Sequence, residues 1–261
     1  MNFKIAICSY RRKNALLQKT YKLLKSFGVP MHNVYIFVAN TEEEEEYKAM
    51  GFECNIVVAF RGLVNARNFA IDYFEDDQNI LFLDDDITSI KVLDVEYTKE
   101  HKASKSHKME YCEFVNSINS YFDDLRSKDL FMFGFYPAGN SLFMKMKRTY
   151  DLRFLVGNAF GIINRRDVKN CTILSDSKED YLRTLQYFRK DGGVMRINSV
   201  FFQTTIYKGT GGMNDENRLI NEQIACDYLL KTHFKVFAIK KCKSIYPEVR
   251  FIRGATWRES D

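Results

Sequence analysis

Short apolar runs alternate with helix-like segments across the first 85 residues, and this alternation constrains the possible folds most strongly. Four apolar runs have the length of buried strands, at residues 4–9, 34–39, 55–59 and 79–83. Three segments between them carry helical spacing or helix start and stop signals, at residues 14–27, 42–50 and 61–74. Strands that alternate with helices in this way predict an α/β fold with a parallel, doubly wound sheet.

The order of elements is looser beyond residue 87. Residues 92–108 are charged, and we expect a surface loop or an irregular excursion there. Helices are expected at 109–126 and 216–233, and strands at 130–135, 155–164, 194–207 and 235–240. Ser177 or Asp176 is expected to cap a helix that begins near Glu179 and Asp180.

The composition argues against several classes of protein. The 261 residues, 46% of them hydrophobic, suffice for one large α/β domain or two small ones. No run of 18 apolar residues predicts a membrane span, and the N-terminal segment turns polar too quickly for a signal peptide. The six cysteines form no C-x-x-C pair, which argues against a zinc cluster or disulfide framework and favours a reducing cytoplasm. The formal charge of +5 suits an anionic substrate or a nucleic acid.

Three consecutive carboxylates follow the fourth apolar run. Asp84, Asp85 and Asp86 would stand at the C-terminal end of a strand, where open α/β sheets bind ligands. Adjacent carboxylates repel one another and need a compensating cation, and oxygen ligands suit Mg²⁺ or Mn²⁺. Because side chains alternate along an extended segment, we expect Asp84 and Asp86 to share one site while Asp85 points elsewhere. The alternative is a polar turn whose acids cap a following helix.

These motifs together resemble a GT-A glycosyltransferase. The resemblance rests on the Ser-Tyr-Arg end of the first strand, the helix start 61–68, the strand end 83–86, the glycine-containing strand 155–164 and the pair Glu179-Asp180. More narrowly, the chain resembles the phage TET/JBP-associated glycosyltransferases. That group is similar to the base J glucosyltransferase and to the T-even phage enzyme that adds a second glucose to glucosylated hydroxymethylcytosine.

The resemblance implies a fold and a division of the chain. The fold would be a GT-A, Rossmann-like mixed sheet with helices on both faces. A single domain would span residues 1–261, with a nucleotide-sugar-binding half at 1–90 and an acceptor-binding half at 91–261.

The resemblance also implies a donor site for a UDP-sugar with Mn²⁺ or Mg²⁺. Asp86 would bind the metal and Asp84 the metal or the ribose, since a metal held there bridges the phosphate oxygens of the leaving group. Nucleotide-sugar binding is assigned to Ser9, Tyr10, Arg12, Asn40, Arg61, Arg67, Asn68, Asp84, Asp85, Gly157 and Asn158. For Arg61 and Arg67 the alternative is a surface arginine, or one paired with a carboxylate of the aspartate cluster.

The acidic pair Glu179 and Asp180 resembles the carboxylates that GT-A enzymes place near the acceptor hydroxyl. If the reaction inverts the anomeric centre, Asp180 is the expected general base. If the reaction retains it, that carboxylate orients the acceptor or stabilises an oxocarbenium-like state. The alternative is an ordinary acidic first turn of a helix.

Basic residues and glycines form the expected acceptor side. DNA and acceptor binding is assigned to Lys145, Lys147, Arg148, Gly211, Gly212, Arg253 and Trp257. Phosphate contacts by basic side chains give salt-dependent affinity that is largely independent of sequence. The alternatives are a solvated basic face and, for the glycines, a simple loop. We expect His233 at a helix C-terminus and do not assign it as a metal ligand.

The predicted function is metal-dependent transfer of a sugar from a UDP-sugar to hydroxymethylpyrimidine, or to glucosylated hydroxymethylcytosine, in phage DNA. Its partners would be the UDP-sugar and double-stranded DNA with modified pyrimidines, with no membrane, in the cytoplasm of the host. Two alternatives stay open at this point. One is a GT-A glycosyltransferase that acts on protein or polysaccharide, and the other is a non-enzymatic module that binds nucleotides or nucleic acids.

Overall fold

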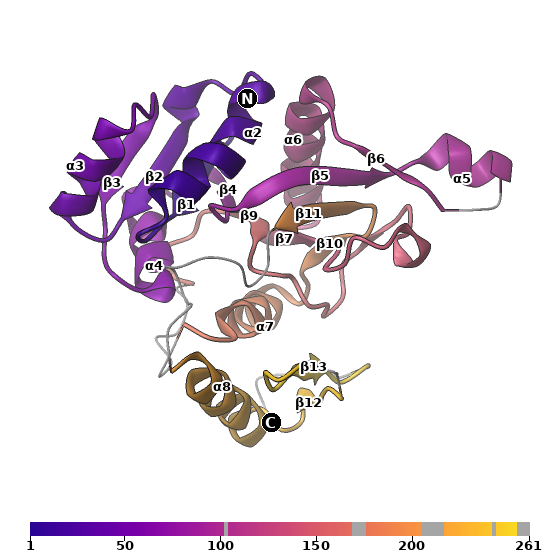
Figure 1. The fold of residues 1–261 in the computed structure, drawn as a ribbon. Coiled ribbons are helices and arrows are strands. Elements are labelled where there is room, and N and C mark those ends of the chain that lie inside the picture. Colours follow the sequence, from indigo (N-terminus) through magenta and orange to yellow (C-terminus); the bar gives the residue numbers. More distant parts are fainter. Residues whose placement is uncertain (102–103, 169–175, 205–216, 242–243, 255–261) are drawn as a thin grey trace.

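A large mixed sheet forms the centre of the protein (Figure 1). It is seen in a computed structural model that describes residues 1–101, 104–168, 176–204, 217–241 and 244–254. In spatial order its strands are β3 (Asn55–Val58), β2 (Val34–Val38), β1 (Lys4–Cys8), β4 (Asn79–Leu83), β9 (Ala159–Ile163), β7 (Met132–Phe135), β10 (Met195–Ile197) and β8 (Arg148–Thr149). The strands β1 to β4 are parallel, as predicted, whereas β9 runs antiparallel between β4 and β7.

Alternating side chains of the central strands build a hydrophobic core on each face of this sheet. On β4, Leu81 belongs to one core and Phe82 to the other, as the twofold period of a strand requires. The first core is covered by α1 (Lys13–Leu16), the π-helical turn η1 (Leu17–Tyr21), α2 (Lys22–Ser26), α3 (Thr41–Ala49) and α6 (Tyr111–Ser127). The second core is covered by α4 (Leu63–Tyr73) and α7 (Glu179–Asp191). The predicted mixed sheet with helices on both faces is therefore confirmed.

A second sheet of three strands departs from the sequence-based prediction. Its strand order is β11 (Val200–Thr204), β5 (Ile87–Leu93) and β6 (Ser106–Lys108), and α5 (Val95–His101) connects the last two in the chain. The prediction of an irregular excursion over 92–108 is thus wrong. The single strand predicted over 194–207 is also wrong, since β10 and β11 belong to different sheets and are separated by Asn198 and Ser199.

The predicted cap of α7 is wrong as well. Lys178 is the N-cap residue, with a left-handed φ of 59°, and its own side chain makes no capping hydrogen bond. Asp176 instead accepts a hydrogen bond from the backbone N–H of Val64, at 2.9 Å, and so satisfies the start of α4. The segment before α7 is therefore tied to the helix that carries Arg67.

The C-terminal elements pack beside α7 (Figure 1). They are α8 (Arg218–Thr232) and the antiparallel pair β12 (Phe237–Ile239) and β13 (Val249–Phe251). Tyr181 and Leu185 of α7 share a core with Leu229 and Phe237. Two 3-10 turns complete the described elements, η2 (Met31–Asn33) and η3 (Ser141–Phe143). Among the described helices, none combines the length and apolar character that crossing a membrane requires.

Candidate active site

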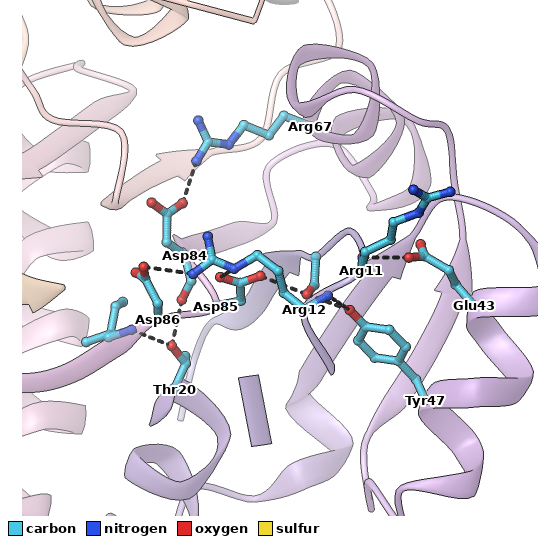
Figure 2. Close-up of polar contacts among 11 residues, drawn as sticks. Arg11, Arg12, Thr20, Glu43, Tyr47, Arg67, Asp84, Asp85 and Asp86 are labelled. Carbon is cyan, nitrogen blue, oxygen red and sulfur yellow. Dashed lines mark hydrogen bonds and ion pairs between the residues drawn. The ribbon is translucent and has the colours of Figure 1, made fainter. Parts of the chain in front are cut away.

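The three aspartates occupy a tight turn between β4 and β5 at the C-terminal edge of the large sheet (Figure 2). Thr20 holds this turn from the side of η1. Its hydroxyl donates to the carbonyl of Asp84 at 2.7 Å and accepts from the N–H of Ile87 at 2.8 Å. A strand follows the turn, so the alternative in which these acids cap a helix is wrong.

The directions of the three carboxylates differ from the prediction. Asp84 faces Arg67, with 3.1 Å between Oδ1 and Nη2. Asp85 and Asp86 both face Arg12, whose Nε lies 3.1 Å from Asp85 Oδ1 and whose Nη2 lies 2.9 Å from Asp86 Oδ2. The expected pairing of Asp84 with Asp86 assumed an extended backbone, and a turn does not alternate its side chains in that way.

Asp85 is the anchor of the turn. Its second oxygen accepts a hydrogen bond from Ser9 Oγ at 2.8 Å, and that hydroxyl also lies 2.8 Å from Tyr47 Oη (Figure 2). Burial raises the pKa of Tyr47 to about 12, so the phenol keeps its proton at neutral pH. Both oxygens of Asp85 are thus engaged, whereas each neighbouring aspartate has an oxygen outside these pairs. These contacts therefore favour a structural role for the Asp85 carboxylate.

A buried charged network adjoins Asp84. Arg67 is 3% exposed and donates to Glu179 Oε1, to Asp84 Oδ1 and, at 2.7 Å, to the carbonyl of Gly157. Arg183 is 1% exposed and donates to the other oxygen of Glu179 at 2.6 Å. Since arginines engage both oxygens of Glu179, the geometry favours a positioning role for this carboxylate over the catalytic one that we predicted.

Gly157 contacts both residues of the predicted acidic pair, Glu179 and Asp180. A Cβ at Gly157 would lie 2.9 Å from Glu179 Oε1, so any other residue here would displace the buried carboxylate. The N–H of Gly157 donates to Asp180 Oδ2 at 3.2 Å. Burial, together with the charge of Glu179, raises the pKa of Asp180 to about 6. A carboxyl group with that pKa is ionised at neutral pH and is a stronger base than an ordinary aspartate.

Asn158 lies between the two acidic groups. Its carbonyl accepts the N–H of Asp84 at 2.8 Å, and its side-chain amide donates to the carbonyl of Phe202 at 3.0 Å. Its Oδ1 atom is buried and has no hydrogen-bond partner within the part of the chain that the structure describes. A buried acceptor without a partner is costly, which favours a ligand donor at this point.

The site carries an excess of negative charge. Five carboxyl groups, on residues 84–86, 179 and 180, outnumber the three guanidinium groups that lie among them, on residues 12, 67 and 183. Burial raises the pKa of Asp84 to about 7 and that of Asp85 to about 6. A divalent cation would offset the excess of carboxylates and would lower the pKa of Asp84 and Asp85.

The carboxylates of the site fit a metal ion that takes its remaining ligands from a substrate and from water. Within the described residues, no group of three or more histidine, cysteine or acidic side chains is arranged to hold a metal ion. Asp84 and Asp86 would therefore supply one or two ligands. Mg²⁺ and Mn²⁺ sites that bind nucleotides commonly use one or two carboxylates, with phosphate oxygens and water as the remaining ligands.

Four other residues were predicted to bind the nucleotide sugar. The ring of Tyr10 has the guanidinium groups of Arg11 at 5.1 Å and Arg61 at 5.3 Å, and Arg61 is exposed. Asn40 caps α3, where its side-chain oxygen accepts the N–H of Glu43 at 2.9 Å. Asn68 is half-buried on α4. The nucleotide contacts of Tyr10, Asn40, Arg61 and Asn68 stay predictions.

The predicted acceptor residues are dispersed. Lys145 and Lys147 are exposed on the segment that leads into β8, and Arg253 is exposed after β13. Arg148 pairs with Asp124 at 2.7 Å, so its charge is compensated within the protein. Gly211, Gly212 and Trp257 lie outside the described residues.

Sequence reasoning missed two residues of the site, Thr20 and Arg183. Thr20 lies within a helical stretch and carried no recognisable signal, because its role depends on a turn 64 residues later. Arg183 did carry one, since it stands four residues after Glu179 on the same helix, a spacing that pairs opposite charges.

Comparison with known proteins supports the fold assignment. No protein-family model and no curated protein matches the chain. Glucosyl-3-phosphoglycerate synthase from Mycobacterium tuberculosis, in complex with Mn²⁺, UDP and glucosyl-3-phosphoglycerate, is 8% identical, with a TM-score of 0.50 over 96% of this chain and 87% of that chain. Its complex with Mn²⁺, UDP-glucose and phosphoglyceric acid is 9% identical, with a TM-score of 0.50 over 97% and 88%. TarS of S. aureus, residues 1–349, is 13% identical, with a TM-score of 0.48 over 90% and 74%. The predicted GT-A, Rossmann-like fold is confirmed.

Proposed function

We propose that the protein is a metal-dependent glycosyltransferase that moves a sugar from a UDP-sugar to a hydroxymethylpyrimidine, or to glucosylated hydroxymethylcytosine, in phage DNA. The observation that carries the proposal is the aspartate turn with Arg12 and Arg67 at the C-terminal edge of a GT-A sheet. Ligands of open α/β sheets bind at this edge. Two structures of similar fold hold Mn²⁺ with UDP or UDP-glucose, which supports the same donor class here.

The diphosphate of the UDP-sugar would be bound by a metal ion and by two arginines at the aspartate turn. Asp86 would hold Mn²⁺ or Mg²⁺, and Asp84 would contact the metal or the ribose; the metal, when bound, would neutralise the charge that develops on the leaving diphosphate. Arg12 and Arg67 supply guanidinium groups suited to phosphate oxygens. Arg67 is held in place by Glu179 and by the carbonyl of Gly157. A guanidinium group that is already held in place needs little reorganisation as charge develops on the leaving diphosphate.

Asp180 is assigned to the acceptor. As the acceptor oxygen forms its bond to the anomeric carbon and the bond to the diphosphate breaks, the hydroxyl proton passes to Asp180 if the reaction inverts that centre. If the reaction retains it, Asp180 orients the acceptor hydroxyl. In either case its pKa of about 6 keeps the group ionised at neutral pH.

The DNA acceptor is supported by the sequence resemblance and by the exposed cations Lys145, Lys147 and Arg253. A hydroxymethyl or glucosyl group at the 5-position of a pyrimidine projects into the major groove, where the C5 substituent is displayed. An acceptor hydroxyl placed there is reachable without removal of the base from the stack. A protein or polysaccharide acceptor is the competing assignment.

Mass spectrometry of digested nucleosides tests the proposal. The protein is incubated with Mn²⁺, a panel of UDP-sugars and DNA that carries cytosine, hydroxymethylcytosine, hydroxymethyluracil or glucosylated hydroxymethylcytosine. We expect one modified nucleoside to gain a sugar, and Asp86→Asn to lose this product while the exposed Asp123→Asn keeps it. DNA is excluded as the acceptor if all four DNAs are inert and a protein or glycan is labelled. The enzyme assignment fails if no UDP-sugar is consumed with any acceptor.

A further inference from the structure

A small protrusion follows β7, and no role has been assigned to its apolar residues. Its tip is the 3-10 turn η3, on which Leu142 is 70% exposed and Phe143 is 63% exposed. Met146, three residues further, is 52% exposed. We refer to residues 139–147 as the protrusion. Adjacent large apolar side chains with this much exposure commonly mark an interaction site.

The protrusion is firmly held at its base. Gly139 lies so close to Phe201 of β11 that a Cβ would approach the ring to 2.6 Å. The hydroxyl of Ser141 donates to the carbonyl of Ser104 at 2.9 Å, and Met144 is buried. The N–H of Lys145 donates to the carbonyl of Asn198 at 3.0 Å. The exposed side chains are therefore presented by a braced turn.

The charge of the protrusion favours a polyanion. Lys145 and Lys147 flank Met146 and are exposed, and neither takes part in an ion pair within the described residues, whereas Arg148 is paired with Asp124. A polyanion that reaches the protrusion would meet the exposed Lys145 and Lys147.

The protrusion lies at the same edge of the sheet as the aspartate turn, so one large substrate can contact both. It leaves the C-terminal end of β7 and leads into β8, so it stands at the edge of the sheet where β4 ends in Asp84. Four strand positions separate β4 from β8, which at about 4.8 Å each is about 19 Å along the edge. One duplex can span that distance.

We propose that the protrusion is a DNA-contacting element in which Phe143 and Leu142 wedge against the bases of the duplex while Lys145 and Lys147 contact its phosphates. Apolar side chains that insert between base steps, next to basic residues, are a recurrent device of DNA-binding proteins. This inference rests on the proposed DNA acceptor and names the surface that engages it. An anionic membrane surface is the competing partner and is an outcome of the test.

Fluorescence anisotropy with a labelled hydroxymethylated duplex tests the inference in the full-length protein. We expect the double variant Leu142→Ser/Phe143→Ser to weaken binding about tenfold or more, by analogy with base-stacking aromatics. Lys145→Gln/Lys147→Gln should lower the salt dependence of log affinity by about two, one for each lost phosphate contact. The matched control is Phe234→Ser/Ile239→Ser, which removes two equally exposed apolar side chains far along the chain, 66% and 68% exposed, and should leave binding unchanged.

A second readout isolates the wedge. A duplex with 2-aminopurine beside the modified base should become more fluorescent with wild-type protein and less so with Leu142→Ser/Phe143→Ser, while UDP binding with Mn²⁺ stays unchanged. If wild-type protein glycosylates DNA but the variant binds and unstacks it normally, the inference is overturned and the proposed function stands. If wild-type protein neither binds nor modifies any DNA, the DNA acceptor fails and the inference with it. Loss of binding to phosphatidylglycerol vesicles with no loss of DNA affinity would assign the protrusion to a membrane surface instead.

Discussion

Two arginines hold the aspartate turn in two separate directions. Arg12 bridges Asp85 and Asp86, and Arg67 faces Asp84. Asp85 has no oxygen left outside its contacts with Arg12 and Ser9, so we assign it to the architecture of the turn. Asp84 and Asp86 keep the role of metal ligands in the proposed function, and the arginines keep that of phosphate contacts.

Asp180 sets the first prediction, which concerns pH. Its pKa is raised to about 6, chiefly by burial, and a proton acceptor works only when it is ionised. With UDP-sugar, Mn²⁺ and acceptor all saturating, we expect the transfer rate to be flat above pH 7 and to fall about tenfold per pH unit below pH 6. The measurement is initial rate against pH between 4.5 and 8.5, a range of about four units centred near that pKa.

Asp180→Asn provides the control for the pH prediction. It should lower the rate about 100-fold or more and remove the fall below pH 6, because no titrating acceptor remains. A variant that keeps the wild-type rate, or a wild-type profile that is unchanged down to pH 5, would contradict the assignment of Asp180.

At the scale of elements, three segments distant in the chain meet around one buried carboxylate. Glu179 at the start of α7 pairs with Arg67 of α4 and with Arg183 one turn later, and the segment before β9 passes beside it at Gly157. Arg183 lies 3.6 Å over the ring of Phe160 of β9, and two of its nitrogens have no hydrogen-bond partner within the described residues. Such a group is retained at a cost in stability, which favours a positioning role.

The second prediction separates stability from positioning in this network. Arg183→Met leaves Glu179 with one partner and should cost about 3 kcal/mol or more of unfolding free energy. The double variant Glu179→Leu/Arg183→Met removes one buried charge of each sign and should recover part of that loss, since Arg67 keeps Asp84 and the carbonyl of Gly157 as partners. Its affinity for UDP with Mn²⁺ should still be about tenfold weaker than wild type, since Arg67 loses its support. Urea unfolding and calorimetry give the two readouts.

If the double variant bound UDP as tightly as the wild type, Glu179 and Arg183 would be structural alone. If it stayed as unstable as the single variant, the network would not be held by mutual compensation of charge. Either result would contradict the role given to this part of α7.

Gly157 carries the third prediction. In Gly157→Ala, the new methyl group would approach Glu179 Oε1 to 2.9 Å, so the buried carboxylate and Arg67 must shift. We expect transfer activity to fall about tenfold or more, since small displacements of positioning groups cost catalysis strongly. Gly51→Ala is the control. It has open space but a φ of +76°, so it should cost about 1–2 kcal/mol of stability and no activity. Equal activity of the two variants would contradict the account.

Local signals in the sequence predicted the first four strands and their helices. The apolar runs and the glycines that follow the first two helices are properties of neighbouring residues, and the resulting parallel strands were correct. The directions of Asp84, Asp85 and Asp86 were not predictable in this way. They depend on Thr20 and Arg12, which reach the turn only after the sheet has formed.

The separation of β10 from β11 within residues 194–207 also depends on contacts between residues far apart in the sequence. The apolar alternation is interrupted only by Asn198 and Ser199, and the hydrogen bonds of Asn198 with the backbone of Lys147 mark where the chain leaves one sheet for the other. Long-range contacts of this type have no signature in a local pattern. For the site, residue types and strand ends were predictable, but the partners of the charged groups were not.

At the scale of the whole molecule, the edge of one sheet organises the proposed activity. The aspartate turn, the segment 157–158 and the protrusion all stand at the same edge, while α4 and α7 approach it from one face with Arg67 and Asp180. The donor would therefore bind over β1 and β4, and the DNA would extend toward β8. Loss of the metal, for example by EDTA, is expected to remove donor binding without unfolding the protein, because both cores lie away from the turn.

Calorimetric titration of UDP tests the central claim most directly, namely that the aspartate turn binds a metal and a diphosphate together. We predict saturable binding to the wild-type protein with Mn²⁺, at least tenfold weaker binding with EDTA, and the same loss for Asp86→Asn in the presence of Mn²⁺, about 1.4 kcal/mol or more. The exposed Asp123→Asn should bind as the wild type does. Equal UDP affinity with and without metal, or full affinity of Asp86→Asn, would contradict the account.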